Sequence, residues 1–380
     1  MSQKIKVLFR HRSMEMGGVE KVILNLFQNI DRTKFDITYI VSLHQGELRN
    51  NVPPHVHYIK INRGKEDFSK IPLINKIQMM ARGLKIKFFE KFPAVLDAIY
   101  LKEKFDVEVA STYADYNSVL KSPNKNSKKV GWLHSDITSP GLKVILPELL
   151  KNLQRFDHVI YGSQQSYDIL HQTFPDVRMK KESVILNAIP MEELKVKAKD
   201  FPVDYMNIPT FVSVARLHSR KGFHKLLEAH KLLLDEGLPH QIIVIGDGEE
   251  RKNLENQIKK LGVEDTFKLL GTKMNPYPYV KNADFYIMPS QTEGWPLIIA
   301  ETLILQIPII ATDVGGIPEM ITHKKNGYLV DYDSEKMKEA MKVFLTDTAL
   351  VETIKEQLKQ SEKQFDNQKI YDEVTKILEK

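Results

Sequence analysis

Hydrophobic and polar positions along the chain follow two alternating periods. Short runs rich in β-branched and aromatic residues are separated by stretches in which apolar residues recur every three or four positions. This alternation predicts parallel sheets covered by helices. The first unit is a strand at Lys4–Phe9, a glycine turn at Met16–Gly18 and an amphipathic helix from Val19 onward. Further strands are expected at Asp36–Val41, Phe105–Ala110, Lys129–Leu133, His158–Gly162 and Ser183–Leu186.

A second series of the same kind follows a stretch with three prolines and no regular period. Its expected helices are Gly222–Glu236, Glu249–Leu261 and Leu297–Leu305, and its expected strands are Thr210–Ala215, Gln241–Ile245, Phe267–Leu270, Phe285–Pro289, Pro308–Ala311 and Gly327–Val330. We therefore predict two doubly wound α/β domains, residues 1–190 and 210–360, joined by a linker at 191–209. A charged helical segment, 361–380, is expected to follow and to return to the first domain. Two such sheets would leave a cleft between the carboxyl ends of their strands, where ligands bind in these folds.

Composition narrows the class of protein. An apolar share of 42% with 27% charged residues is that of a globular protein able to build cores. The chain has no cysteine, which excludes disulfides, thiolate zinc sites and cysteine nucleophiles and fits a reducing compartment. The N-terminal segment does not have the pattern of a secretory signal, and the longest apolar stretches are too short to cross a bilayer. We therefore expect a cytoplasmic protein.

Two cations follow the first strand of the second series. Arg216 and Lys221 stand just before the start of the helix that begins at Gly222. A planar guanidinium, an ammonium group and the unpaired N–H groups of a helix start together suit a diphosphate. A solvated basic loop is the alternative.

Two glutamates accompany another strand end. Glu293 lies at the start of the helix Leu297–Leu305, and Glu301 interrupts the apolar residues of that helix. A buried carboxylate needs donors, and the two adjacent hydroxyls of a ribose would supply them. The alternatives are a helix-start acid for Glu293 and a structural ion pair for Glu301. Glycine turns at Gly246–Glu250 and Asp313–Glu319 lack the full dinucleotide fingerprint and are typical of ordinary strand-to-helix connections.

Taken in order, these pieces resemble one known family, the family 4 retaining glycosyltransferases of the GT-B fold. The matching segments of the second half are VARLHSRKGFHKLLEAH, IIVIGDGEERKNLE, LLGTKMNPYPYVKNADFYIMPSQTEGWPLIIAETL and PIIATDVGGIPEMI. The first half contributes FRHRSMEMGGVEKVILNL, GWLHSD and VILNAIP. Together they span positions from about 9 to 322 in the family's order, and the ordered set is far more specific than any single segment.

The resemblance implies roles for particular residues. Arg216 and Lys221 match the pair that neutralises the donor diphosphate, Glu301 the glutamate that holds the ribose, and Glu293 the group beside the donor sugar. His134 matches a histidine near that sugar, which its residue type would also allow as a general base. The backbone at Trp295 and Leu297 would approach the sugar and phosphate. The remaining donor-binding positions are Gly17, Gly18, Gly271, Thr272, Gly294 and Pro296.

The chain departs from the family pattern at two places. Gly294-Trp295-Pro296 stands where Gly-Phe-Gly is common, and proline removes one N–H donor. Ala188 replaces a usual glycine after Asn187. The resemblance further implies transfer with retention, in which the leaving phosphate takes the acceptor proton. No cofactor and no metal site are expected. The nucleotide of the donor is expected to be UDP, with GDP as the alternative.

The segment Phe68–Phe92 carries six Lys or Arg residues, a single acid, and many large apolar residues. This mixture is typical of a helix on an anionic membrane surface. It favours a protein that is peripheral on the inner face of the membrane. The expected acceptor is then a glycan or lipid-linked molecule in bacterial surface polysaccharide or lipopolysaccharide assembly. The alternative is an amphipathic helix packed on the sheet with a solvated basic face. Nucleic acid is not an expected partner, because the aromatic residues are not interleaved as a stacking platform.

Two other functions remain open from the sequence. A nucleotide-sugar epimerase would also bind UDP-sugars, but it would turn over without an acceptor. A catalytically degenerate nucleotide-binding partner would keep the fold and lose transfer. The presence together of Arg216, Lys221, Glu293 and Glu301 favours an active hexosyl- or N-acetylhexosaminyltransferase over both.

Overall fold

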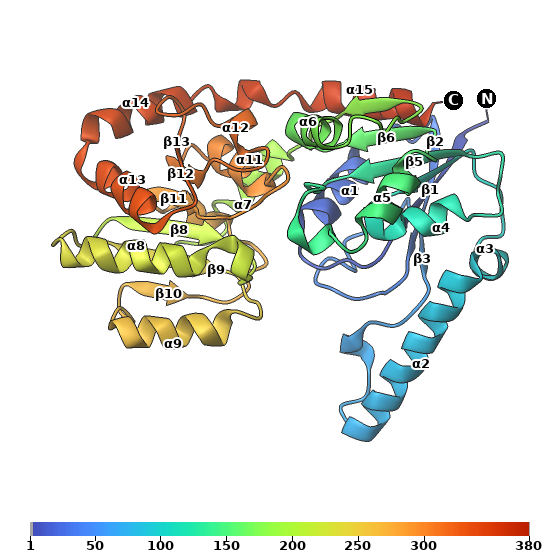
Figure 1. Cartoon of the computed structure of the whole chain (residues 1–380), viewed down its shortest axis with the longest axis horizontal. Helices are drawn as coiled ribbons and strands as arrows, with labels where there is room; N and C mark the ends of the chain where they lie inside the picture. Colours follow the sequence, from blue (N-terminus) through green and yellow to red (C-terminus); the bar gives the residue numbers. More distant parts are fainter. Residues whose placement is uncertain (1–2, 380) are drawn as a thin grey trace. The chain divides into compact units, whose positions relative to one another are not determined.

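The computed structural model describes residues 3–379 of the 380-residue chain, which form two compact units (Figure 1). Unit 1 is the chain up to Ala188 together with the segment from Asn367 onward, and unit 2 is Ile189–Asp366. Each unit contains one sheet whose paired strands all run parallel, with helices against the sheet. The predicted fold class, two doubly wound parallel-sheet domains, is confirmed.

Unit 1 has a seven-stranded sheet in the order β3-β2-β1-β4-β5-β6-β7. Its strands are β1 Ile5–His11, β2 Phe35–Val41, β3 His57–Lys60, β4 Val107–Ala110, β5 Lys128–Leu133, β6 His158–Tyr161 and β7 Glu182–Val184. Its α-helices are α1 Gly18–Asn29, α2 Pro72–Lys91, α3 Pro93–Tyr100, α4 Tyr116–Leu120, α5 Leu146–Leu153, α6 Gln164–Thr173 and α15 Asn367–Leu378. Short 3-10 turns lie at η1 Lys65–Asp67, η2 Tyr113–Asp115 and η3 Pro140–Leu142.

Unit 2 has a six-stranded sheet in the order β10-β9-β8-β11-β12-β13. Its strands are β8 Thr210–Val214, β9 Gln241–Ile245, β10 Phe267–Leu269, β11 Phe285–Met288, β12 Ile309–Thr312 and β13 Tyr328–Val330. Its α-helices are α7 Met191–Lys197, α8 Phe223–Asp235, α9 Arg251–Leu261, α10 Tyr277–Lys281, α11 Leu297–Ile304, α12 Ile317–Met320, α13 Ser334–Thr346 and α14 Thr348–Leu358. Its 3-10 turns are η4 Ser219–Lys221 and η5 Ser361–Gln364.

Strand order reverses at one place in each sheet. The reversal lies between β1 and β4 in unit 1 and between β8 and β11 in unit 2. On either side of such a switch point the connecting helices leave toward opposite faces of the sheet, so a crevice opens beyond the carboxyl ends of the two strands. The residues that follow these four strands are therefore the ones to inspect for a site.

Every strand expected from the hydrophobic pattern is present, with ends shifted by no more than two residues. One described strand was not expected, β3, a short edge strand whose side chains are exposed or only partly buried, so its sequence carries little alternation. The stretch 191–209, expected as an irregular linker, contains helix α7 and lies within unit 2. Leu194 of that helix is buried, which explains why these residues are ordered against the unit.

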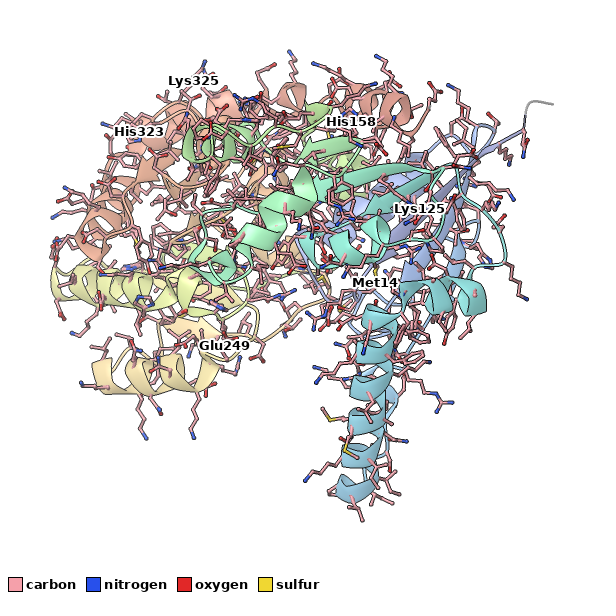
Figure 2. All side chains as sticks on the ribbon, turned by 45° about the vertical axis from the view of Figure 1, so that its right-hand side comes forward. Met14, Lys125, His158, Glu249, His323 and Lys325 are labelled. Atoms are coloured by element: carbon pink, nitrogen blue, oxygen red, sulfur yellow. The ribbon has the colours of Figure 1, made fainter. Side chains whose placement is uncertain are left out.

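Helix α2 begins at the far end of an excursion from unit 1 and runs back toward the unit, with side chains on all sides (Figures 1 and 2). It ends at Lys91, beside α3, which follows directly from Pro93. Only Phe89 is buried among the described residues of α2. It packs with Leu96 of α3 and with Phe105 before β4.

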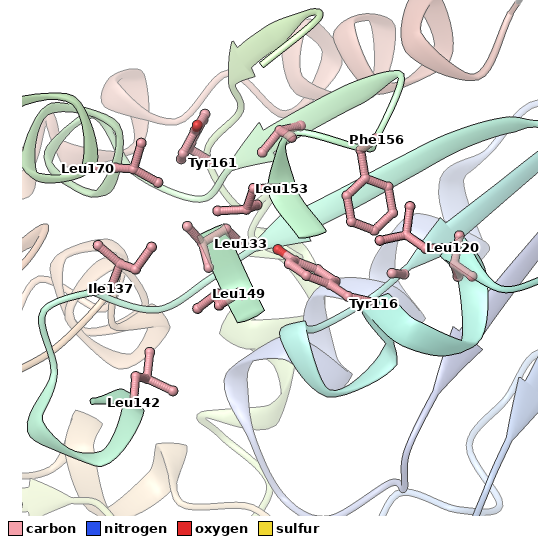
Figure 3. Close-up of a cluster of buried hydrophobic side chains, with 13 residues drawn as sticks. Tyr116, Leu120, Leu133, Ile137, Leu142, Leu149, Leu153, Phe156, Tyr161 and Leu170 are labelled. Atoms are coloured by element: carbon pink, nitrogen blue, oxygen red, sulfur yellow. The ribbon is translucent and has the colours of Figure 1, made fainter. Parts of the chain in front are cut away.

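A second hydrophobic cluster of unit 1 lies among β5, β6, α4 and α5 (Figure 3). Its aromatic centre is Tyr116 and Phe156, whose rings meet edge to face with centroids 4.8 Å apart. The Tyr116 hydroxyl donates to the carbonyl of Trp132 at 3.1 Å, so the one polar atom that this ring brings into the core is satisfied.

A buried charge network ties α3 to the sheet. The Arg10 guanidinium, on β1, donates to both carboxylate oxygens of Asp97 on α3, at 2.9 and 2.8 Å, and to Glu108 on β4 at 3.2 Å. Lys129 on β5 donates to Glu108 at 2.7 Å. Burial alone would raise the pKa of Glu108, but the charges of Arg10 and Lys129 lower it. Paired charges in the interior of unit 1 thus hold α3 against the sheet.

The end of the chain closes unit 1. Helix α15 packs on the unit, where the Lys128 ammonium donates to the carbonyl of Ile377 at 2.6 Å and the Tyr371 hydroxyl donates to Asn25 at 3.2 Å. An exposed ion pair joins Lys34 to Glu379 at 2.8 Å. Residues 367 onward therefore belong to the first unit although they follow the second in sequence.

Candidate functional site

In unit 2, polar side chains gather at the switch point, beyond β8 and β11. The Lys221 ammonium, in the turn after β8, lies 2.6 Å from Oε1 of Glu293, which follows β11. Ser290 donates its hydroxyl proton to the same oxygen at 2.6 Å. Both the lysine and the glutamate side chains are largely covered, at 14% and 9% exposed. An ammonium and a carboxylate from two different loops are thus held together at the edge of the sheet where this fold binds ligands.

Backbone contacts fix the loops that carry these groups. The Gln291 N–H donates to the carbonyl of Arg220 at 2.7 Å, which joins the loop after β11 to the turn after β8. Gly222, at the start of α8, has a φ of 71°, in the left-handed region that favours glycine. A Cβ there would overlap the carbonyl oxygen of Pro289. The close approach of these two loops therefore depends on a residue without a side chain.

This packing gives a prediction for Gly222→Ala. We expect the variant to lower the free energy of unfolding of unit 2 by about 1–3 kcal/mol more than Gly262→Ala, because it adds an overlap to the backbone strain. Gly262 is the matched control: its φ of 66° is nearly the same, but a Cβ there would meet no atom within 4 Å. Urea unfolding followed by circular dichroism measures both, and equal losses would contradict the argument.

Glu301 lies on α11 and is buried, at 4% exposed. The hydroxyl of Tyr277, on α10, donates to its Oε1 at 2.8 Å. Burial, together with the neighbouring Glu301 charge, raises the pKa of the Tyr277 hydroxyl, so it stays protonated and donating. The carboxylate is thereby presented in a fixed orientation inside an otherwise apolar helix.

The other predicted donor-site positions also follow strands of this sheet. Arg216 is exposed just beyond β8, and Gly271 and Thr272 follow β10. Gly294, Trp295 and Pro296 lead into α11, whose first residue is Leu297. The Trp295 ring is buried and meets Phe365 edge to face, with centroids 6.2 Å apart. Pro296 is the N-cap of α11, a position where its missing N–H leaves no helical bond unmade.

Unit 1 has a second polar cluster at its own switch point. His11 ends β1, and its ring lies between two acids: Nε2 is 3.4 Å from Glu20 in the first turn of α1, and Nδ1 is 3.6 Å from Asp115 after β4. Burial lowers the pKa of His11, but hydrogen bonds and charge from Asp115 and Glu20 outweigh it and raise the pKa to about 9. The ring is therefore an imidazolium at neutral pH.

His134 follows β5 in the same unit, and its ring stacks on Trp132 with centroids 5.1 Å apart. Burial, reinforced by the charge of His11, lowers the pKa of His134 to about 3. The ring is neutral at pH 7, and its low basicity favours a hydrogen-bonding role over that of a general base. Gly17 is the N-cap of α1 and Gly18 its first residue, so both stand at a helix start.

Sequence reasoning missed several members of these clusters. Ser290 stands three positions before Glu293, and Tyr277 stands far from Glu301 in sequence, so no local spacing pairs them. The sequence gives only a weak indication of the cluster of His11, Glu20 and Asp115. His11 stands at the end of a strand, and Glu20 stands in the first turn of a helix that follows two glycines. Tertiary packing brings these groups together.

Comparison with known proteins shows which family has this arrangement. Residues 197–361, which include all the site residues of unit 2, match the family model of the glycosyl transferases group 1. Unit 2 belongs to this family. The match begins in α7 and ends in η5, so it covers almost the whole of unit 2.

Similarity outside the matched region extends over the full chain. An N-acetylgalactosamine-N,N'-diacetylbacillosaminyl-diphospho-undecaprenol 4-alpha-N-acetylgalactosaminyltransferase of Campylobacter jejuni is 24% identical over 375 residues, 96% of this chain and 97% of that protein. Anabaena HepE, solved in complex with UDP-glucose, superposes with a TM-score of 0.74 at 19% identity, covering 98% of this chain and 99% of that one. Sucrose-phosphate synthase of Thermosynechococcus elongatus gives a TM-score of 0.76 at 16% identity, with 98% of each chain covered. These two structures share the GT-B fold with the glycosyltransferase.

Among residues 3–379, none of the glycosyltransferase's helices combines the length and the apolar character needed to cross a bilayer.

Proposed function

We propose that this glycosyltransferase moves a hexose or N-acetylhexosamine from a UDP-sugar to a lipid-linked glycan, with retention of the anomeric configuration, in the assembly of a bacterial surface polysaccharide or lipopolysaccharide. The name of the Campylobacter jejuni relative, similar along the whole chain, specifies a diphospho-undecaprenol acceptor. Anabaena HepE was solved with UDP-glucose. The first supports a lipid-linked acceptor, and the second supports a UDP-sugar ahead of the alternative, a GDP-sugar.

The observation that carries the proposal is the Lys221–Glu293 pair beyond β8 and β11, with Arg216 in the same loop as the lysine. A departing nucleoside diphosphate develops negative charge, and a cation held in a partly covered site stabilises that charge without having to move. We assign Lys221 and Arg216 to the diphosphate. The N-termini of α8 and α11 follow these loops and add unpaired N–H groups.

The two glutamates take different roles in this proposal. Glu301, fixed by Tyr277, accepts hydrogen bonds from the ribose hydroxyls. Glu293, held by Lys221 and Ser290, lies beside the donor sugar, together with the backbone at Gly294–Leu297. Gly271 and Thr272 complete the nucleotide side. In unit 1, Gly17, Gly18 and His134 are assigned to the sugar and the acceptor.

The proposed reaction breaks the bond between the anomeric carbon and the diphosphate oxygen. Positive charge develops on the sugar ring, and the acceptor hydroxyl attacks from the face that the leaving group vacates. The acceptor proton passes to the departing phosphate, so the products are a glycoside and UDP. His134, with its pKa lowered to about 3, would contact a hydroxyl and leave the proton transfer to the phosphate.

A donor and acceptor screen tests the proposal. The purified protein is incubated with UDP-, GDP- and ADP-sugars, with and without undecaprenyl-diphosphate-linked glycans, and the products are separated by mass. We expect transfer from a UDP-sugar that requires the acceptor. Conversion of the sugar without an acceptor would indicate an epimerase. Absence of turnover with every pair, from a protein that still binds UDP, would indicate a degenerate nucleotide-binding partner.

A further inference from the structure

Helix α2 presents a continuous apolar stripe to solvent. Five large side chains recur at intervals of three or four residues, so they lie along one side of the helix. These residues, called the outer stripe below, are Leu73, Ile77, Met80, Leu84 and Phe88. They are between 47% and 69% exposed. Large apolar side chains in such a row are uncommon on a surface unless something covers them.

The opposite side of α2 is anchored to unit 1, which fixes the direction of the outer stripe. Arg82 donates to the Gln45 side chain at 3.1 Å and to the carbonyl of Arg63 at 3.3 Å. Lys85 donates to the carbonyl of Ile61 and to the Tyr100 hydroxyl, both at 2.9 Å. Together with the buried Phe89, these contacts hold the inner side. The stripe therefore faces away from the unit to which the helix belongs.

This arrangement differs from one of the two interpretations of the sequence. An amphipathic helix packed on the sheet would bury its apolar residues and expose its basic ones. Here two cations, Arg82 and Lys85, point inward and the row of apolar residues points outward.

The charges around the stripe are of one sign. Lys76, Lys87 and Lys91 lie on the same side of α2 as the stripe and are exposed, and Glu90 is the one acid in the sequence of the helix. A lysine stem lies along apolar surroundings while its ammonium reaches the polar boundary. Self-association through the stripe would bring these lysines close to those of the second copy. The charge pattern therefore favours an anionic surface over another α2.

We propose that the outer stripe of α2 enters the headgroup region of a bilayer containing anionic lipids, with Lys76, Lys87 and Lys91 contacting the lipid phosphates. Exposed Phe92, Val95 and Ile99 continue the apolar surface from the end of α2 into α3. A helix of this kind lies in the plane of the interface, held by buried apolar area and by attraction between the lysines and anionic lipid. This binding does not depend on the donor or on the reaction proposed above.

The test is co-sedimentation of the full chain with vesicles of phosphatidylcholine alone and of phosphatidylcholine with phosphatidylglycerol, at low ionic strength. We expect the protein to bind the anionic vesicles. Lys76→Gln/Lys87→Gln/Lys91→Gln should weaken this binding about a hundredfold, because each lysine near an anionic surface contributes about fivefold. Ile77→Ser/Met80→Ser/Leu84→Ser should weaken it at least about tenfold through lost apolar burial.

The matched control removes the same charge elsewhere. Lys252, Lys259 and Lys260 are exposed on α9 of unit 2, and their replacement by glutamine should leave vesicle binding unchanged. Equal loss in this control would reveal nonspecific adsorption and overturn the proposal. Failure of the unaltered chain to bind anionic vesicles would also overturn it. So would a dimer that the serine variant dissociates in the absence of vesicle binding, since the stripe would then be an interface between copies.

Discussion

Replacement of Lys221 by methionine is expected to lower the turnover number by about 10²–10³-fold, which corresponds to about 3–4 kcal/mol of lost transition-state stabilisation. The ammonium lies 2.6 Å from Glu293 at the carboxyl end of the β8–β11 switch point. In the proposed reaction it meets the charge that develops on the leaving diphosphate. Methionine keeps most of the length of the side chain and removes its charge and N–H donors. Steady-state kinetics with the donor found in the screen measures the effect.

Two companion variants make this result specific. Lys252→Met removes an exposed lysine from α9 and should leave turnover unchanged. Lys221→Arg keeps the charge and should recover part of the lost rate. A folded Lys221→Met protein with normal turnover would remove the lysine from the reaction and leave its pair with Glu293 as a structural contact.

Replacement of Asp97 by alanine is expected to lower the free energy of unfolding of unit 1 by about 3–5 kcal/mol. The change removes the partner that accepts two hydrogen bonds from the buried Arg10 guanidinium and leaves its 3.2 Å hydrogen bond to Glu108. A buried cation left with half of its pairing is costly, because the charge stays away from water. Chemical unfolding followed by far-ultraviolet circular dichroism gives the value.

The control for Asp97 is an exposed ion pair in the same unit. Glu103 pairs with Lys6 at the surface, where both side chains are more than a third exposed. Glu103→Ala should therefore cost no more than about 1 kcal/mol. A loss of similar size in the two variants would show that burial does not set the value of the Arg10–Asp97 pair.

Most of the fold follows from the sequence. The central strands of both sheets are buried, so their runs of apolar residues stand out from the helices between them. Edge strand β3 does not stand out, because its four side chains are exposed or only partly buried. The sequence predicts a linker in place of helix α7, because this stretch contains three prolines and has no regular hydrophobic period. In the helix, Met191–Lys197, only Leu194 is buried. Such segments are ordered by packing against distant parts of the chain, which the hydrophobic pattern of their own sequence does not predict.

Sequence predicts a site residue where its position after a strand end is recognisable, and it does not predict the contacts between such residues. Lys221 and Glu293 could be placed at strand ends, but their 2.6 Å contact and the supporting Ser290 come from the approach of two loops at Gly222. The tyrosine that orients Glu301 comes from another helix. The pKa values of His11 and His134 depend on neighbours from three separate segments, which contain Glu20, Asp115 and His11 itself. The outward direction of the outer stripe of α2 depends on the hydrogen bonds that Arg82 and Lys85 donate to unit 1.

The central claim is that unit 2 holds a nucleoside diphosphate between the Lys221–Glu293 loops and Glu301. Calorimetric titration of UDP into the unaltered chain, Glu301→Gln and Glu264→Gln tests it most directly. Glu301→Gln keeps an acceptor for Tyr277 and removes the charge, whereas Glu264 is an exposed carboxylate before β10. Loss of charge-assisted hydrogen bonds to the ribose should weaken the Kd about 10–100-fold in the first variant and leave it unchanged in the second. Equal affinity in all three proteins, or no binding of UDP to any of them, would contradict the assignment.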